Sequence, residues 1–164
     1  MNDSERSNKF IVSTLEDLIP VARALIERFG NRTVVLLTGE LGVGKTKLVE
    51  TVAREMSRET SSHEAEVASP TFAIHQVYNL GTNRRIDHFD LYRINSEDEL
   101  ETVGLWDVLT ASNGLVFIEW PEKLQPSGRM SNNSKFCVPG WHIIDVRLLQ
   151  LKSGAREISV SSSC

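Results

Sequence analysis

The most informative stretch of the sequence is a glycine-rich segment that matches the phosphate-binding pattern G-x-x-x-x-G-K-[ST] at every fixed position. Its residues are Gly39, Glu40, Leu41, Gly42, Val43, Gly44, Lys45 and Thr46. Glycines let the backbone curl so that successive N–H groups point at phosphate oxygens, and a helix start adds partial positive charge. Lys45 then supplies a full charge to the β- and γ-phosphates, and the Thr46 hydroxyl is placed to ligate Mg²⁺. The segment predicts a site for ATP or ADP with Mg²⁺.

Apolar segments on both sides of this loop are typical of the strand and helix that position such a site. Residues 33–37 are β-branched or apolar throughout, which predicts a strand buried on both faces of a parallel sheet. Residues 45–56 carry apolar side chains at helical spacing, so we predict an amphipathic helix there. A glycine turn that matched the pattern by chance would not need a buried strand before it and an amphipathic helix after it. The flanking patterns therefore favour a working phosphate site.

A magnesium site of this kind also needs a carboxylate, usually at the end of a neighbouring apolar strand. Glu119 directly follows the apolar run 115–118, and Asp90 lies in a second strand-like segment. Either carboxylate could instead be a solvated strand end or a surface group paired with a nearby arginine. We predict that Lys45, Asp90 and Glu119 form the catalytic group and that Thr46 and Glu119 hold the metal. Which of the two carboxylates positions the attacking water is left open.

Two more residues have a chemical interpretation and a plainer alternative. Thr71 follows Ser69 and Pro70 and could sense the γ-phosphate as a switch residue, or could simply open a strand. His88 lies close to two aspartates in the sequence, which suggests a separate metal site. No third well-spaced ligand is evident for such a site.

The remaining patterns outline the rest of the fold. Ser13 and Glu16 have capping-box spacing, so we predict a helix from Ser13 to about residue 29. Other segments are predicted as strands (10–12, 72–80, 85–94, 115–118, 143–151 and 157–161), as a helix (97–109), as loops (58–68 and 125–140) and as a disordered tail (1–9). We therefore predict one α/β domain over residues 1–164 with a P-loop NTPase fold. Its central sheet should be mixed and mostly parallel, flanked by helices, with antiparallel hairpins.

The composition excludes several classes of protein. The chain has 164 residues, of which 40% are hydrophobic and 24% charged, and its formal net charge is −4. An acidic domain is poorly suited to grip a phosphate backbone by itself, so direct nucleic-acid binding is disfavoured. The apolar runs are too short to span a bilayer and the N-terminus has no secretory pattern. We expect a cytoplasmic protein with no membrane association.

Taken together, four motifs resemble those of the TsaE (YjeE) family, bacterial ATPases needed to make threonylcarbamoyladenosine in tRNA. The motifs are the glycine loop 39–46, the segment 69–72 (SPTF), the segment 88–93 (HFDLYR) and the segment 118–122 (IEWPE). The loop alone is shared by many unrelated proteins. The last three motifs, in this order and at these distances, are specific to the family.

The resemblance implies roles for individual residues and for partners. Thr46 and Glu119 would be magnesium ligands, Asp90 a catalytic carboxylate, and Thr71 part of a switch segment. Trp120 would lie beside the site. Two outlying nucleotide contacts are also implied, by Thr14 and Arg156. The implied partners are the TsaD and TsaB subunits of the threonylcarbamoyl transferase, which would carry the tRNA contacts, and the implied fold is a mixed sheet with helices on both sides.

Three alternatives share the loop chemistry. A small-molecule kinase would need an acceptor pocket and an Arg-bearing lid, and Arg58 is the only Lys or Arg in residues 57–68. A GTPase switch would carry D-x-x-G and N-K-x-D strings, which do not occur here. A subunit could also bind ATP only to dock on partners. Slow hydrolysis that rises when partners are added would separate this last alternative from an ATPase.

Overall fold

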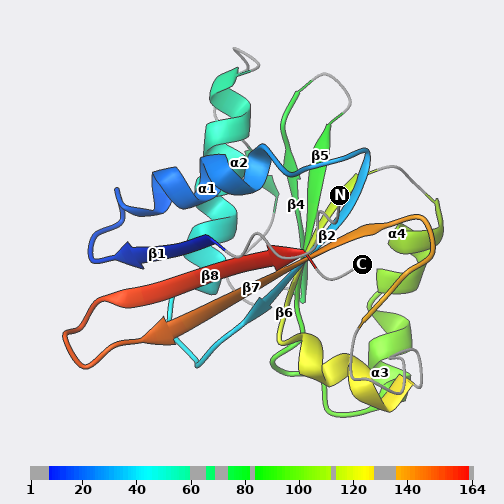
Figure 1. The fold of residues 1–164 in the computed structure, drawn as a ribbon. Coiled ribbons are helices and arrows are strands. Elements are labelled where there is room, and N and C mark those ends of the chain that lie inside the picture. The colour runs from blue at the N-terminus through cyan, green and yellow to red at the C-terminus, as the bar shows by residue number, and fades with distance from the viewer. Residues whose placement is uncertain are drawn as a thin grey trace, which may run out of the picture.

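The computed structural model describes residues 8–59, 66–68, 74–81, 84–111, 114–127 and 136–162. Its strands are β1 (Asn8–Val12), β2 (Arg32–Thr38), β3 (Glu66–Ala68), β4 (His75–Asn79), β5 (Arg85–Asp90), β6 (Gly114–Glu119), β7 (His142–Gln150) and β8 (Arg156–Ser162). Its helices are α1 (Leu18–Ile26), α2 (Lys45–Glu59), α3 (Glu97–Thr102), α4 (Leu105–Ala111) and the 3₁₀ helix η1 (Pro121–Ser127). All these strands join one sheet in the order β1-β8-β7-β2-β6-β5-β4-β3 (Figure 1).

The sheet is mixed, as predicted, but its parallel part is confined to the centre. β7, β2, β6 and β5 run parallel to one another. The outer pairs β1–β8, β8–β7, β5–β4 and β4–β3 are antiparallel. Among the described strands the antiparallel pairings therefore outnumber the parallel ones, so the expectation of a mostly parallel sheet was wrong. The reason is that the turns between β4 and β5 and between β7 and β8 are short, and short turns join only antiparallel neighbours.

Helices cover both faces of the sheet and create two apolar cores. Along β2, Val35 and Leu37 pack in the core under α1 and α2, whereas Val34 and Leu36 pack in the core under α3, α4 and η1. Figure 1 shows the two helix groups on opposite sides of the sheet. Both faces of β2 are therefore covered by apolar cores, which accounts for its continuous apolar sequence. Nearly every residue of β2 is buried, and this rigid strand leads directly into the glycine loop.

The first helix begins later than predicted. Asp17 accepts hydrogen bonds from the backbone N–H groups of Ser13 and Thr14, both at 2.8 Å, and its own N–H donates to the Thr14 hydroxyl at 3.4 Å. The bonds from Thr14 and Ser13 hold the pKa of the Asp17 carboxyl below its ordinary value. The predicted cap of Ser13 with Glu16 was therefore wrong by one residue. Because α1 begins at Leu18, Pro20 lies in the first turn, where its missing N–H breaks no hydrogen bond.

Several other boundaries also differ from the predictions. The tail was expected to reach residue 9, but β1 begins at Asn8. The predicted helix 97–109 is divided into α3 and α4 at Gly104, whose φ is +77°. The strand expected to reach residue 94 ends at Asp90.

Both predicted loops contain regular structure. The expected loop 58–68 includes the end of α2 and the strand β3. In the expected loop 125–140, residues 125–127 belong to η1 and Phe136 is buried, while residues 128–135 lie outside the described ranges. Of the helices in the described residues, none is long and apolar enough to cross a membrane.

Candidate functional site

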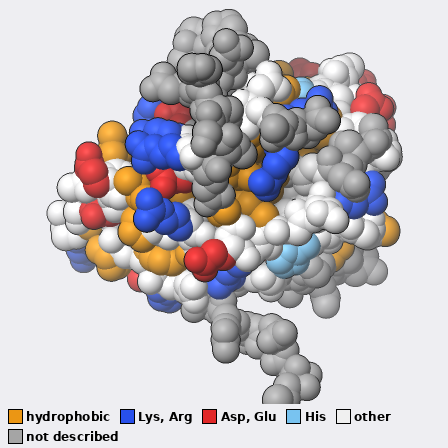
Figure 2. Space-filling view, turned by 90° about the horizontal axis from the view of Figure 1, so that it is seen from above, with side chains coloured by type: hydrophobic (Ala, Val, Ile, Leu, Met, Phe, Trp, Pro, Cys, Tyr) orange, Lys and Arg blue, Asp and Glu red, His pale blue; other side chains and the backbone are white. Residues whose placement is uncertain are grey.

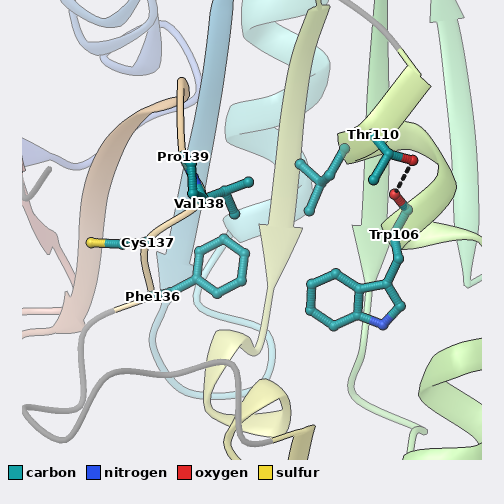
Figure 3. Close-up of a pocket in the computed structure, with 7 residues that line it drawn as sticks. Trp106, Thr110, Phe136, Cys137, Val138 and Pro139 are labelled. Carbon is teal, nitrogen blue, oxygen red and sulfur yellow. Dashed lines mark hydrogen bonds between the residues drawn. The ribbon is translucent and has the colours of Figure 1, made fainter.

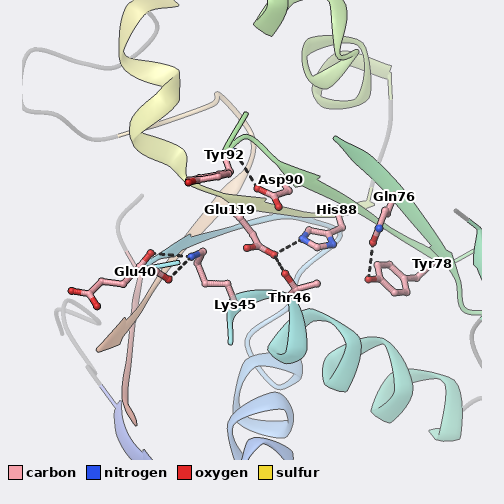
Figure 4. Close-up of polar contacts among 10 residues, drawn as sticks. Glu40, Lys45, Thr46, Gln76, Tyr78, His88, Asp90, Tyr92 and Glu119 are labelled. Atoms are coloured by element: carbon pink, nitrogen blue, oxygen red, sulfur yellow. Dashed lines mark hydrogen bonds and ion pairs between the residues drawn. The ribbon is translucent and has the colours of Figure 1, made fainter. Parts of the chain in front are cut away.

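The predicted catalytic and metal-binding residues come together where the central parallel strands end, and they are Lys45, Thr46, Asp90 and Glu119. β2 ends at Thr38, β5 at Asp90 and β6 at Glu119, and α2 begins at Lys45 just beyond this edge. The carboxyl ends of parallel strands are the usual place for a ligand crevice in an open α/β sheet. A cavity of about 220 Å³ opens there, and it is lined by Leu41, Gly42, Gly44, Lys45, Thr46, Lys47, Asp90, Glu119 and Trp120. Figure 4 shows the polar contacts around it.

The backbone of the loop requires glycine at its first position. Gly39 has a φ of +147°, and a Cβ placed on it would meet the carbonyl oxygen of Leu148 at 2.5 Å. Gly42 and Gly44 also have positive φ, +77° and +110°. No L side chain fits comfortably at such angles. The glycines of the motif are therefore needed for the path of the chain, and this path wraps the loop around the start of α2.

Lys45 is held under the loop with its ammonium group facing the cavity. The side chain is 4% exposed, and Nζ donates hydrogen bonds to the carbonyl oxygens of Gly39 and Glu40, both at 2.9 Å. Nζ also lies 4.1 Å from the centroid of the Trp120 ring. Burial lowers the pKa of Lys45 below its ordinary value, and the negative charge of Glu119 acts most strongly in the opposite direction. A desolvated cation of this kind binds an incoming anion more strongly than an exposed lysine would.

Glu119 is linked to both neighbouring elements through one oxygen. Its Oε1 accepts a hydrogen bond from the Thr46 hydroxyl at 2.7 Å and lies 2.9 Å from Nε2 of His88. The carboxylate is almost completely buried, with 3% of Glu119 exposed. The prediction that Glu119 would be close to Thr46 is thus met in the geometry, and Figure 4 shows Thr46 and His88 approaching it from α2 and from β5.

The donor atoms at this point fit a magnesium ion. A hydroxyl and a carboxylate are the oxygen ligands that Mg²⁺ prefers, with metal–oxygen distances of about 2.1 Å. Neighbouring ligands of an octahedral ion are then about 3 Å apart, which is close to the 2.7 Å between Thr46 Oγ1 and Glu119 Oε1. Within the described residues no group of three or more His, Cys, Asp or Glu side chains could hold a metal. The separate metal site considered for His88 therefore finds no support.

Asp90 lies beside Glu119 but has different partners. The two residues are in register on the parallel strands β5 and β6, so both carboxylates project from the same edge. Asp90 is half-buried, and its Oδ1 accepts the backbone N–H of Tyr92 at 3.0 Å. Arg85, one of its possible ion-pair partners, instead donates from Nε to Asp87 at 2.9 Å. Asp90 therefore reaches the cavity as a more accessible carboxylate than Glu119.

Trp120 closes one side of the cavity in a strained backbone conformation. Its φ is +59°, and no other non-glycine residue in the described ranges has a positive φ. Its ring lies over Lys45 and 5.0 Å from the ring of Tyr92. Left-handed backbone costs about 1–2 kcal/mol for an L residue, and such conformations concentrate at functional sites. The family resemblance implied that Trp120 would lie beside the site, but the sequence contains no signal for this backbone strain.

The two outlying nucleotide contacts differ in their positions. Arg156 begins β8, and its Nε lies 4.0 Å from the position that a Cβ on Gly44 would occupy. This Nε is buried, and within the described ranges it has no hydrogen-bond partner. Thr14 follows β1, whose Val12 is in register with Arg156, but Thr14 is absent from the described lining of the cavity. Thr71, the predicted switch residue, lies outside the described residues.

His88 is the residue at this site that sequence reasoning did not place correctly. It is 2% exposed, and no local pattern in the sequence connects it with Glu119. The connection depends on the parallel register, in which His88 lies opposite Phe117 and Asp90 opposite Glu119. The side chain of His88 then reaches across to the neighbouring strand and one row toward its end. Only knowledge of the strand pairing could have predicted this contact.

A second cavity lies on the other side of the sheet and has a different character. Its volume is about 250 Å³, and its lining is mainly apolar: Trp106, Leu109, Thr110, Phe136, Cys137, Val138 and Pro139 (Figure 3). It contains no charged side chain among the described residues that could bind a phosphate.

The face in Figure 2 shows Lys and Arg side chains interspersed with acidic and apolar ones rather than gathered in one patch. The glycine-loop cavity is therefore the better candidate site for a charged ligand.

Comparison with known proteins agrees with these features. A family model described as "Threonylcarbamoyl adenosine biosynthesis protein TsaE" matches residues 12–150. Proteins named "tRNA threonylcarbamoyladenosine biosynthesis protein TsaE" from Rickettsia felis and Haemophilus influenzae are 33% and 37% identical to this chain over 68% and 56% of its length. The matched part is 61% and 54% of those two proteins. A protein of the same name from Synechocystis is 32% identical over 74% of each chain.

A solved structure supports the fold. The crystal structure of Bacillus subtilis YdiB superposes with a TM-score of 0.64, covering 96% of this chain and 86% of that one, at 18% sequence identity. At this level of identity the likeness concerns the fold alone. It confirms the predicted α/β class with a mixed sheet flanked by helices.

Proposed function

The chain belongs to the TsaE family of threonylcarbamoyladenosine biosynthesis proteins, and from this premise we propose that it binds ATP with Mg²⁺ and hydrolyses ATP slowly in support of that tRNA modification. The observation that carries the proposal is the cavity at the end of β2. There a glycine loop, a buried ammonium, a hydroxyl and a buried carboxylate converge on one space. These are the groups that a triphosphate and its metal require.

Each group has a distinct role in binding. The loop amides and the N-terminus of α2 receive the phosphate oxygens. Lys45 uses two of its three donors on Gly39 and Glu40, so its ammonium is fixed in place to meet the β- and γ-phosphates. Thr46 and Glu119 would hold Mg²⁺, which when bound neutralises charge on the phosphates. Arg156 would add a second cation near the loop, because its buried Nε lacks a partner in the described residues.

Asp90 is the better candidate for positioning the attacking water. Both the Thr46 hydroxyl and His88 engage Glu119, and this carboxylate is buried. Asp90 lines the same cavity, is partly exposed, and has its orientation fixed by the N–H of Tyr92. A group that activates water must reach it at hydrogen-bond distance, and an accessible carboxylate can do so. We assign water positioning to Asp90 and metal binding to Glu119.

The relatives' names place those proteins in the same modification pathway, which supports partners from that pathway for this chain. We propose TsaD and TsaB as these partners, with tRNA contacted indirectly. The net charge of −4 supports an indirect role, since affinity for the phosphate backbone comes mainly from Lys and Arg. The cytoplasm is the compartment in which this role would be carried out.

Titration calorimetry with Mg²⁺ and a non-hydrolysable ATP analogue tests the binding proposal. In Lys45→Ala we expect the affinity to fall about 100-fold, because a hydrogen bond to a charged group contributes about 1.5–3 kcal/mol. Lys9→Ala is the matched control, since Lys9 on the edge strand β1 pairs with Glu157 on β8 and neither residue is in the described lining of the cavity. Equal affinity in Lys45→Ala and Lys9→Ala would refute the proposed site.

Hydrolysis is tested separately with purified partners. We expect slow release of phosphate from ATP by the protein alone and a faster rate when TsaD and TsaB are added. Tight binding without any hydrolysis under either condition would leave the chain as a nucleotide-dependent docking subunit and would contradict the ATPase assignment.

A further inference from the structure

His88 is the most unusual buried polar residue in the described part of the chain. It lies on β5, is 2% exposed, and has Nε2 2.9 Å from Oε1 of Glu119. The ring of Tyr78 is stacked near it, with centroids 6.1 Å apart. A carboxylate oxygen accepts hydrogen bonds, so this contact is a hydrogen bond in the tautomer of His88 that carries its proton on Nε2.

The other ring nitrogen shows that this residue is not an ordinary packing histidine. Nδ1 of His88 is buried and has no hydrogen-bond partner among the residues that the structure describes. An unsatisfied buried polar atom destabilises the folded protein, and an apolar side chain at this position would avoid that loss. The surroundings favour an apolar side chain as well, because the residues beside it in the sheet include Phe117, which is fully buried. Because Nδ1 of His88 lowers the stability of the fold, the presence of histidine here points to a role for its other ring nitrogen, Nε2.

That reason is the carboxylate of Glu119. A buried carboxylate is stable as a charge only when donors surround it. The described structure provides two such donors, the Thr46 hydroxyl at 2.7 Å and His88 at 2.9 Å. Thr46 is itself a proposed metal ligand, so its hydroxyl approaches Glu119 from the side of the metal. His88 is the described side chain that holds the carboxylate from another element, β5, without being a ligand.

We propose that His88 is a positioning residue for the magnesium site: it orients the Glu119 carboxylate toward Thr46 before and during metal binding. His88 does not touch nucleotide or metal in this proposal, and it acts only through Glu119. The inference rests on the proposed function, since it assumes that Thr46 and Glu119 hold Mg²⁺. Its consequence is specific: loss of the Nε2 donor should weaken the contribution of magnesium to nucleotide binding and leave metal-free nucleotide binding unchanged.

The test measures the affinity for ADP and for a non-hydrolysable ATP analogue by calorimetry, once with Mg²⁺ and once with EDTA. The ratio of the two affinities gives the magnesium contribution. His88→Leu removes the donor and keeps an apolar side chain, and we expect the ratio to fall about 10-fold or more, the usual effect of removing a group that orients a metal ligand. His88→Gln keeps an N–H donor at similar reach, so its ratio should stay within about threefold of the wild type.

The chain contains a matched control in the neighbouring strand. His75 on β4 has Nε2 2.9 Å from Oδ1 of Asp87, the same distance as in the His88–Glu119 pair. Neither His75 nor Asp87 lines the cavity among the described residues. His75→Leu therefore breaks a histidine–carboxylate contact of the same kind, and the magnesium ratio should not change. Titration of Mn²⁺ by electron paramagnetic resonance with ADP present supplies a direct metal readout, in which only His88→Leu should release bound Mn²⁺.

Each outcome has a defined meaning. A normal magnesium ratio in His88→Leu would overturn the proposal, and so would equal losses in His88→Leu and His75→Leu. If His88→Leu does not unfold cooperatively, His88→Asn and His88→Gln carry the test. Asparagine has the same amide as glutamine on a shorter side chain, so the ratio should fall in His88→Asn and be retained in His88→Gln. Equal ratios in these two variants would overturn the proposal. If wild-type protein shows no magnesium contribution, the proposed function itself fails.

Discussion

The glycine loop allows a prediction whose size follows from the structure. In Gly39→Ala the new methyl group would meet the carbonyl oxygen of Leu148 at 2.5 Å and a Val43 methyl carbon at 3.0 Å, at a φ of +147°. The clash is with β7 backbone, which cannot move aside as a flexible side chain would. Overpacking of this kind costs about 1–3 kcal/mol and left-handed backbone about 1–2 kcal/mol. Alanine also restricts the unfolded chain, which returns about 0.4–1 kcal/mol.

We therefore expect Gly39→Ala to lower the free energy of unfolding by about 2–4 kcal/mol in urea titrations. Gly154→Ala separates the two causes, because Gly154 has a φ of +88° but nothing within 4 Å of the new Cβ. It should lose only about 1 kcal/mol or less. Nucleotide affinity should fall in Gly39→Ala, since the Gly39 carbonyl accepts from Lys45, and should be retained in Gly154→Ala. Equal losses of stability in the two variants would refute the reasoning.

Three further predictions concern single side chains. Glu119→Gln should lower Mg²⁺-dependent nucleotide affinity about 10–100-fold, measured by calorimetry. The free energy of unfolding of the free protein should change by less than about 1 kcal/mol, because the amide oxygen can still accept both hydrogen bonds. Unchanged nucleotide affinity would contradict this prediction. Asp90→Asn should keep nucleotide affinity and lose about 100-fold or more in ATP hydrolysis, and a normal rate would remove Asp90 from the mechanism. Burial, with smaller effects of the Glu50 and Glu119 charges, raises the pKa of Tyr78 to about 12, so the unfolded chain loses this proton first. In urea titrations the wild type should thus lose up to about 2–3 kcal/mol of stability between pH 10 and 12. Tyr78→Phe should not show this loss. Equal declines of stability in the two proteins would contradict the role of Tyr78.

The parts of the account that were predictable from sequence share one property: a local pattern determines them. The apolar run of β2 predicted a strand covered on both faces, and the structure buries Val34 and Val35 on opposite sides. The loop pattern that follows predicted the positions of Lys45 and Thr46 at the start of α2. The apolar run that ends in Glu119 predicted a neighbouring strand with its carboxylate at the same edge.

The parts that were not predictable depend on choices between equally good local patterns or on strand register. Thr14 with Asp17 and Ser13 with Glu16 have the same spacing, and only the fold decides that the first pair forms the hydrogen bonds. The contact of His88 with Glu119 needs the parallel pairing of β5 with β6.

Hairpin geometry and backbone strain were also beyond local patterns. The expectation of a mostly parallel sheet failed because two short hairpins add antiparallel strands outside the parallel centre. The β4–β5 hairpin does so toward one edge of the sheet and the β7–β8 hairpin toward the other. The positive φ of Trp120 has no counterpart in the sequence, since the residue type normally avoids it.

The central claim is that one cavity holds a nucleotide and its metal, with the charge of Lys45 on the phosphates and the oxygens of Thr46 and Glu119 on magnesium. A crystal structure of the protein with Mg²⁺ and a non-hydrolysable ATP analogue tests this most directly. We predict the triphosphate in the glycine loop, the Lys45 ammonium in contact with its phosphates, and the metal in contact with both Thr46 and Glu119. A nucleotide bound elsewhere, or a Glu119 carboxylate turned away from the metal, would contradict the account.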